Sequence, residues 1–168
     1  TQAAELCKSD LVSNMVGEFD QMQGLAGYYY ALHEGLNDDV AHALKEHYQP
    51  KFAGDELPGT MTGTIVALAD RIDTLCGIFG IGQKPTGSKD PFALRRASLG
   101  VLRLLVEKQL PLDLKALLRT AAVQHGNNIA NADETVEATF AYMVERFRAW
   151  YEEDQIAADD DRSDCLEL

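Results

Sequence analysis

Two carboxylates and several histidines have the residue types and spacing of a metal centre. Asp70 and Asp73 stand three residues apart in VALADRIDTL, so in a helix they share one flank. His33, His42 and His47 precede them in two shorter amphipathic segments. Imidazole and carboxylate groups on neighbouring helices are a common make-up of hydrolytic metal sites. One hypothesis is therefore a metal-dependent phosphohydrolase, with His33, His47, Asp70 and Asp73 as its ligands.

A second interpretation of the same carboxylates needs no metal. Asp70 and Asp73 would pair with Arg71, Lys45 or backbone amides at the edge of a helical bundle. We favour this interpretation, because His42 and His47 are five residues apart and cannot both point at one ion from one helix. We expect no metal in this chain.

A second constellation is the turn PTGSKDP and the segment that follows it. The chain has a net charge of −12, yet five cations and only Asp90 lie between residues 84 and 103. Thr86, Ser88, Lys89 and the free amides at a helix start are groups that hold an anion. The pattern GxxxxGK[ST] is absent, so the turn is not a P-loop.

The basic residues of this segment have a helical period. Lys89, Arg96 and Arg103 recur every seven residues, with Arg95 beside them, so they are expected to form a stripe along one helix. A sugar-phosphate backbone could lie across such a stripe, although an ordinary solvated helix face explains it equally well. The candidate nucleic-acid-binding residues are Lys84, Thr86, Ser88, Lys89, Arg95, Arg96 and Arg103.

The elements that must position these groups are all helices. Apolar residues recur at intervals of three and four along most of the chain, which predicts an all-α bundle of about seven helices. The fifth helix should begin with Asp90 as its N-cap and Pro91 as its first residue. The expected helices span 3–17, 20–34, 37–48, 61–80, 91–108, 111–125 and 133–155.

Composition bounds the protein class. With 168 residues and 46% hydrophobic content, the chain can bury the core of one ordinary domain. Three cysteines without CxxC spacing make a disulfide framework or structural zinc improbable. No apolar run reaches membrane-span length, so we expect a cytoplasmic protein with no membrane partner. Because the chain lacks an initiating Met, we also expect it to be part of a longer protein.

The expected organisation has three parts. Residues 1–130 form a helical domain, residues 131–155 form a helix that leads onward into the parent chain, and residues 156–168 form an acidic, disordered tail. That tail belongs to a segment, residues 152–168, that holds eight acids and only Arg162.

The order and spacing of three stretches carry a family resemblance. DLVSNMVGEFDQMQGLAGYYYAL, ALKEHYQPKFAGDELP and VALADRIDTLCGIFGIGQKPTGSKDPFALRRASLGVLRLL resemble the β subunit of the bacterial two-subunit glycyl-tRNA synthetase. The resemblance spans roughly residues 3–155, and PTGSKDPFALRR is its most specific part. It implies an α-subunit partner that carries the aminoacylation site, with its ATP and Mg²⁺, and a β subunit that binds tRNA(Gly).

Within that family, this chain is similar to the HD-like helical domain that precedes the anticodon-binding domain. HD domains are metal-dependent phosphohydrolases with a His-Asp pair and a later aspartate, which corresponds to Asp70. The chain contains no His-Asp dipeptide, and Tyr48 follows His47 where the carboxylate is needed. The resemblance therefore implies a retained fold, no catalytic residue and no cofactor in this chain. Its function would be to bind and position tRNA, with a metal phosphohydrolase or a structural spacer as alternatives.

Overall fold

The computed structural model describes the backbone of residues 2–86 and 89–164, and the side chains of residues 2–86 and 89–152. These residues confirm the all-α class, because they contain helices and no strand beyond an isolated bridge between Thr86 and Lys89. The bounds are α1 Gln2–Leu6, α2 Asn14–Glu18, α3 Leu25–His33, α4 Asp38–Glu46, α5 Met61–Gly80, α6 Leu94–Glu107, α7 Leu114–Gln124 and α8 Ala132–Asp164, with 3-10 turns η1 Ser9–Val12, η2 Asp20–Met22 and η3 Gly126–Asn128.

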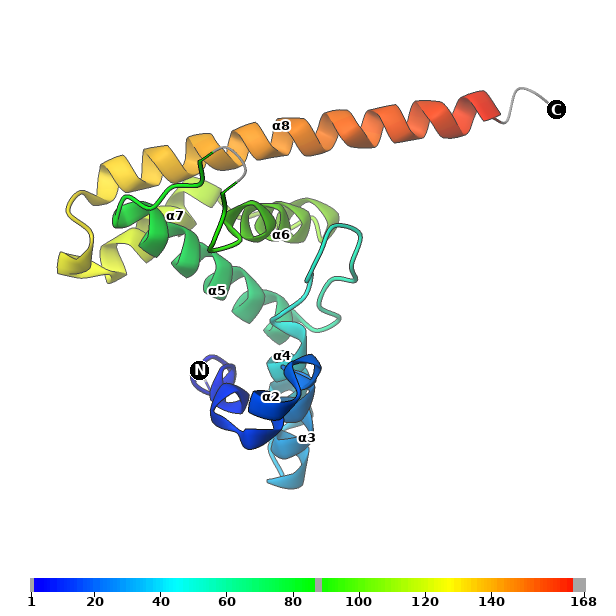
Figure 1. Cartoon of the computed structure of the whole chain (residues 1–168), viewed down its shortest axis with the longest axis vertical. Coiled ribbons are helices and arrows are strands. Elements are labelled where there is room, and N and C mark those ends of the chain that lie inside the picture. Colours follow the sequence, from blue (N-terminus) through cyan, green and yellow to red (C-terminus); the bar gives the residue numbers. More distant parts are fainter. Residues whose placement is uncertain (1, 87–88, 165–168) are drawn as a thin grey trace.

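The long helix α5 organises the molecule, and it coincides with the predicted span. It begins where the Thr60 side chain accepts a hydrogen bond from the amide of Gly63, which satisfies an otherwise unpaired donor. Figure 1 shows α1–α4 gathered at one end of α5 and α6–α8 packed along the rest. Helix α5 therefore contacts both groups of helices and contributes side chains to the packing of each.

Most of the hydrophobic core lies between α5, α6, α7 and α8. Leu75, Cys76, Leu104, Leu118 and Met143 are fully buried there. The helices α1, α3 and α4 bury only small clusters of alanines and a few larger residues around Leu44 and Val66. At about 1.5–3 kcal/mol for each fully buried aliphatic side chain, the α5–α8 core supplies most of the hydrophobic stabilisation.

The N-terminal segment differs from the expected continuous helix over 3–17. It forms α1, η1 and α2, separated at Lys8 and at Ser13, whose side chain caps α2 through the amide of Val16. The buried carboxylate of Asp10 accepts a hydrogen bond from the amide of Gly24 at 2.5 Å. Gly24 has φ 81°, and a Cβ there would lie 2.8 Å from the Tyr48 ring. A contact between distant segments therefore overrides the local helical pattern.

The expected start of the helix over 91–108 is also wrong by one turn. Helix α6 begins at Leu94, because Ala93 takes the left-handed conformation with φ 53° and interrupts any helix from Pro91. Asp90 still caps the helix from outside it. Its two carboxylate oxygens accept from the amides of Leu94 and Arg95 at 2.8 and 2.9 Å.

Helix α8 continues past the expected end at residue 155, and its described backbone reaches Asp164. Figure 1 shows its first half lying on the bundle and its second half extending beyond it. The division at residues 130 and 155 and the disordered tail stay predictions, as does the HD-like character of the fold. Within residues 2–86 and 89–164, no helix is long and apolar enough to cross a membrane.

Candidate functional site

The Arg71 side chain lies at the centre of the candidate site. It projects from α5 into the space between the end of α4 and α6, and it is 9% exposed. Its guanidinium donates hydrogen bonds of 2.9–3.1 Å to the carbonyls of His47, Ala67, Tyr48 and Pro50. Arg71 thus satisfies the carbonyls at the end of α4 and in the following turn, which is the chemistry that a C-terminal helix end requires.

His47 is buried beside Arg71 with one ring nitrogen unpaired. Its Nδ1 lies 3.2 and 3.0 Å from the carbonyl oxygens of Ala43 and Leu44. Because carbonyls only accept, Nδ1 carries the proton and Nε2 presents a lone pair. Nε2 is buried and has no hydrogen-bond partner among the described residues. Burial lowers the pKa of His47 to about 4, helped by the positive charge of Lys8, so the ring is neutral at pH 7.

The two candidate metal-binding carboxylates have other partners. The ammonium of Lys8 donates to Oδ2 of Asp70 at 3.0 Å. Nε2 of His125 lies 3.1 Å from Oδ1 of Asp73, an exposed carboxylate. The prediction that these carboxylates have protein partners is thus confirmed, but the partners are Lys8 and His125 instead of Arg71, Lys45 or backbone amides.

The four proposed metal ligands do not meet in one site, although His47 and Asp70 line the same pocket. His33 is exposed at the last residue of α3, whereas His47 is buried at the end of α4. Among residues 2–86 and 89–152, no three or more His, Cys, Asp or Glu side chains are placed to hold a metal ion. His33 and Asp73 therefore lie outside the place where His47 and Asp70 meet.

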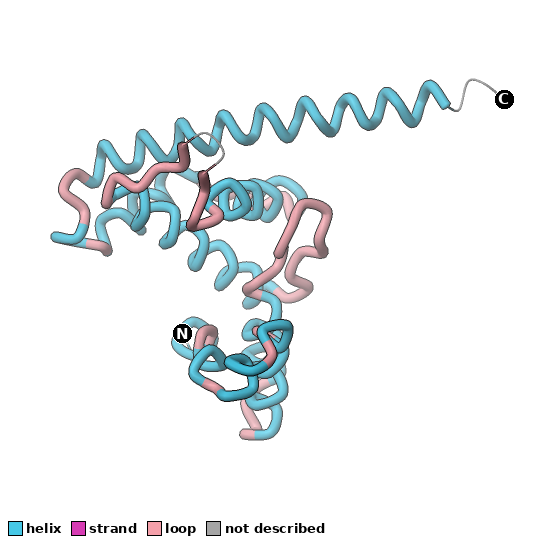
Figure 2. Tube along the Cα trace, in the orientation of Figure 1, coloured by secondary structure: helices cyan, strands magenta, loops and turns pink. Residues whose placement is uncertain are grey.

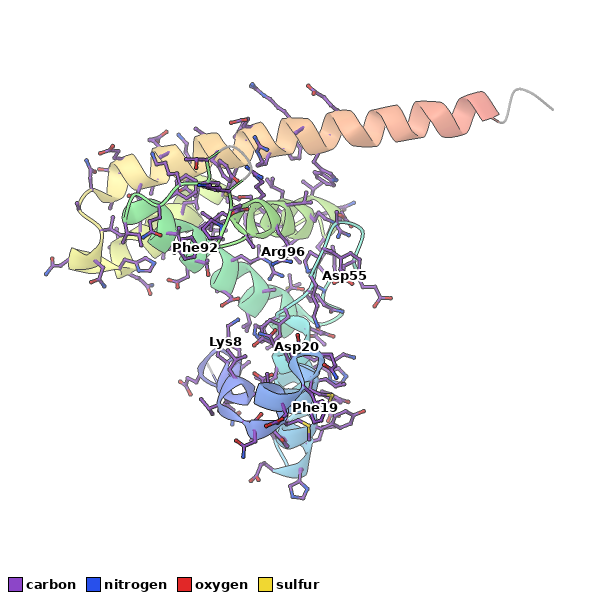
Figure 3. The ribbon with its side chains drawn as sticks, in the orientation of Figure 1. Lys8, Phe19, Asp20, Asp55, Phe92 and Arg96 are labelled. Atoms are coloured by element: carbon purple, nitrogen blue, oxygen red, sulfur yellow. The ribbon has the colours of Figure 1, made fainter. Side chains whose placement is uncertain are left out.

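A pocket of about 340 Å³ opens where α4, α5 and α6 meet. We call it the His47 pocket. It fits the lower part of the size range of small-ligand sites. It is lined by Gln23, His47, Tyr48, Pro50, Lys51, Asp70, Arg71, Thr74, Phe92, Ala93, Arg96 and Ala97. Figure 3 labels Phe92 and Arg96 at the start of α6, and Lys8 in the N-terminal segment.

The loop from α4 to α5 forms one wall of this pocket. Figure 2 shows this long connection beside the end of α6. It contains the cis peptide bond between Gln49 and Pro50. The carboxylate of Asp55 accepts from the amide of Lys51 at 2.6 Å, and the Asp55 carbonyl accepts from Arg103 at 2.9 Å. The loop is therefore tied both to itself and to α6.

The turn before α6 presents part of the predicted basic set. Thr86 and Lys89 exchange two backbone hydrogen bonds of 3.1 and 2.9 Å, and both side chains are exposed. Lys84 is also exposed, with its ammonium 5.9 Å from the centre of the Phe79 ring. Ser88 lies outside the described residues. The helix-start amides expected to bind an anion are instead occupied by Asp90.

The predicted stripe of Lys89, Arg96 and Arg103 does not form. Lys89 precedes α6, and Arg103 is buried, with its Nε donating to Glu107 at 2.6 Å. Arg95 is partly buried, and its charge acts on the nearby Tyr142 phenol, whose pKa burial raises. Arg96 is exposed and makes no ion pair or hydrogen bond with any described residue. Of the predicted basic residues, the ones that face solvent are therefore Lys84, Lys89 and Arg96, which we call the basic surface.

Sequence reasoning missed several residues of the pocket. Gln23, Lys51 and Phe92 carry no periodic or motif signal, because they lie in turns outside the helices. Lys8 was also missed, since its partner Asp70 is 62 residues away in the chain. The loop over 49–60 contains two prolines and two glycines, a composition typical of an ordered connection that does not show which side chains the loop presents.

Comparison with known proteins identifies the family. Residues 1–162 match the family described as "Glycyl-tRNA synthetase beta subunit". The glycine–tRNA ligase β subunit of Actinobacillus pleuropneumoniae serotype 5b is 56% identical over 158 residues, which are 94% of this chain and 23% of that protein. Those of Chromohalobacter salexigens and Pectobacterium carotovorum are 53% and 54% identical, each over 95% of this chain and 23% of their own length.

The match covers nearly the whole chain, including α5, the His47 pocket and the basic surface. The chain spans about a quarter of the length of these curated relatives. It belongs to the glycyl-tRNA synthetase β-subunit family.

Proposed function

We propose that this chain is a tRNA-binding and positioning module of a glycyl-tRNA synthetase β subunit. It would support the ATP-dependent attachment of glycine to tRNA(Gly) in the cytoplasm, with an α subunit as its partner. ATP and Mg²⁺ would act in that α subunit, so this chain needs no cofactor of its own. Membership of the family supports a role in charging tRNA with glycine. One structural observation on this chain supports the more specific role of binding tRNA.

That observation is the basic surface. Lys84, Lys89 and Arg96 are exposed within a short segment of a chain whose net charge is −12. The rest of such an acidic surface repels a polyanion, so RNA is directed to this segment. Phosphate contacts of this kind orient a nucleic acid without reading its sequence. The module would therefore add affinity and orientation, while recognition of the tRNA identity lies elsewhere.

The side chains with internal partners have a different role. Arg103 supports the loop over 49–60 through the Asp55 carbonyl, and Arg95 is partly buried near Tyr142. Their charges still contribute to the local potential, but they are not placed to grip phosphates. Reversing the charge of Arg96 therefore tests the contact with phosphate without removing an internal contact of the fold.

The test is binding of this chain to tRNA(Gly) across a salt series. We expect log Kd to rise with log salt, and Arg96→Glu to weaken binding and to reduce the salt slope by about one. The control is Arg119→Glu, the same charge reversal on an exposed residue of α7 outside the pocket. Equal affinity of wild type and Arg96→Glu would overturn the module and favour a structural spacer.

A further inference from the structure

The His47 pocket collects positive charge from three separate elements. Its lining includes Arg71 of α5, Arg96 of α6 and Lys51 of the loop that follows α4. Among the described residues of this lining, the one carboxylate is Asp70, which is already paired with Lys8 at 3.0 Å. The pocket therefore has a net positive charge, although the chain as a whole has a net charge of −12.

Two of these cations have side chains that a ligand can reach. Lys51 and Arg96 are exposed, and their charged groups make no hydrogen bond or ion pair with any described residue. The nearby carboxylate of Asp55 accepts from the backbone amide of Lys51 at 2.6 Å, and no hydrogen bond joins it to the Lys51 ammonium. Both cations are therefore available to an anion that enters the pocket.

The third cation, Arg71, adds charge to the pocket without adding a free donor. The two terminal nitrogens of its guanidinium donate to four backbone carbonyls, which are neutral and leave its charge unbalanced. Burial lowers the pKa of Arg71, and the neighbouring charge of Arg96 lowers it further, against the opposite effect of Asp70. The two guanidinium groups therefore repel each other, and an anion bound beside them would relieve that repulsion.

We propose that the His47 pocket binds one phosphate group, which Lys51 and Arg96 hold together while Arg71 contributes its charge. A guanidinium presents paired N–H groups to phosphate oxygens, and an ammonium binds them as a point charge. The volume of about 340 Å³ also admits part of the molecule that carries the phosphate. The phosphate belongs either to the backbone of a bound RNA or to a free phosphate compound. The first source rests on the proposed function, and the second does not.

Lys51 separates this phosphate site from the basic surface. It lies in the loop after α4 and does not belong to the basic surface, whereas Arg96 belongs to both. A phosphate bound to Lys51 and Arg96 would join that loop to the start of α6. Because a ligand that binds only the folded state stabilises it, we expect phosphate to raise the melting temperature of the chain.

The test measures binding of inorganic phosphate by titration calorimetry and by thermal unfolding, against sodium chloride of equal ionic strength. We expect saturable binding and a higher melting temperature in phosphate. Lys51→Gln should weaken phosphate binding by about tenfold, as the loss of one charge-assisted contact predicts, and Lys51→Arg should retain it. The control is Lys45→Gln, which removes the same charge from an exposed lysine of α4 outside the pocket lining and should bind phosphate like wild type.

A spectroscopic measurement locates the bound phosphate. The backbone amide resonances of Lys51 and Arg96 should shift along one binding curve when inorganic phosphate is added, because a single ligand contacts both residues. Shifts that leave these two residues unchanged would place the phosphate outside the pocket. Equal effects of phosphate and chloride, or wild-type phosphate affinity of Lys51→Gln, would also overturn the site.

Competition with tRNA(Gly) at constant ionic strength distinguishes the two sources and the two proposals. If tRNA(Gly) displaces phosphate and binds Lys51→Gln more weakly than wild type, the pocket holds a backbone phosphate of the RNA. If phosphate binds and tRNA(Gly) does not displace it, the source is a free phosphate compound. Absence of any tRNA binding would then refute the tRNA module and leave the pocket standing. If tRNA(Gly) binds through Arg96 while Lys51→Gln changes neither phosphate nor tRNA binding, the pocket is wrong and the module stands.

Discussion

Gly100 of α6 leaves open the space that the Arg71 side chain crosses. A Cβ on Gly100 would lie 2.7 Å from Nε and 3.1 Å from Cδ of Arg71. Both distances are shorter than normal contact, and Arg71 cannot shift cheaply because four carbonyls hold its guanidinium. The absence of a side chain on α6 therefore permits α5 to satisfy the end of α4.

Gly100→Ala is expected to destabilise the protein by about 1–3 kcal/mol, because overpacking outweighs the better helix propensity of alanine. Urea unfolding measures this change. Gly17→Ala in α2 is the control, since nothing lies within 4 Å of its Cβ and the change should be neutral or stabilising. Equal stability of Gly100→Ala and wild type would contradict the packing argument.

Arg71→Met should destabilise the protein by about 3 kcal/mol. The substitution leaves the carbonyls of His47, Tyr48 and Pro50 without their donor, and unpaired buried groups carry the full desolvation cost. Arg119→Met on the exposed face of α7 should change stability by less than about 0.5 kcal/mol. In a double-mutant cycle, Gly100→Ala should cost less in the Arg71→Met background. Strict additivity would show that the two residues do not interact.

The stability should depend on pH through His47. Its pKa is about 4 in the folded protein against an ordinary value of 6.5, so the unfolded chain binds the extra proton in that interval. Stability is therefore retained above pH 6.5 and falls by up to about 3 kcal/mol as the pH drops to 4. Urea unfolding across this range should show a weaker decline for His47→Asn than for wild type. If the stability of the two proteins fell equally with pH, His47 would not be the group responsible.

Asp90→Ala should cost about 1 kcal/mol, because it removes the acceptors of the Leu94 and Arg95 amides. Asp90→Asn should cost less, since it keeps one acceptor oxygen. Asp20→Ala, at an exposed position in η2, serves as the control for loss of a surface carboxylate. Thermal unfolding ranks the three variants. The cap is unimportant if Asp90→Ala and Asp20→Ala melt alike.

Added Mn²⁺ or a chelator should leave the melting temperature of the wild-type chain unchanged. The ammonium of Lys8 already neutralises Asp70 at 3.0 Å, the nearby His47 is buried, and His33 is exposed at the end of α3. A ligand that binds only the folded state raises the melting temperature, so differential scanning calorimetry is a direct check. A rise with Mn²⁺ that disappears in Asp70→Asn would revive the phosphohydrolase.

The sequence predicts α5 well because every relevant signal is local. Thr60 precedes the helix as a cap, and the apolar stripe continues to Phe79 without interruption. The same reasoning places α6 one turn too early. An Asp-Pro pair is a normal helix start, but Ala93 adopts a left-handed conformation that no local propensity favours. The Asp90 side chain spans this residue and holds the amides of Leu94 and Arg95, an arrangement that the Asp-Pro pair does not indicate.

The sequence shows where the basic residues cluster along the chain, but not which of them face solvent. Periodicity places Arg96 and Arg103 on one face of a helix, and this face includes the boundary with the loop over 49–60. Arg103 is buried there because the Asp55 carbonyl accepts from it, a contact between residues 48 positions apart. Arg71 has the same explanation, since its acceptors lie on the preceding helix and loop. Long side chains with distant carbonyl partners are the main source of the errors.

Helix α8 turns small rotations into long displacements. Its 33 residues correspond to a rod of about 50 Å, and its later turns stand clear of the other helices (Figure 1). A tilt of about 10° at the base would carry the far end through about 9 Å, more than the width of a phosphate contact. Packing of Val136 and Met143 against the core therefore sets the direction in which α8 extends. Substitutions at these two residues would alter geometry far from where they lie.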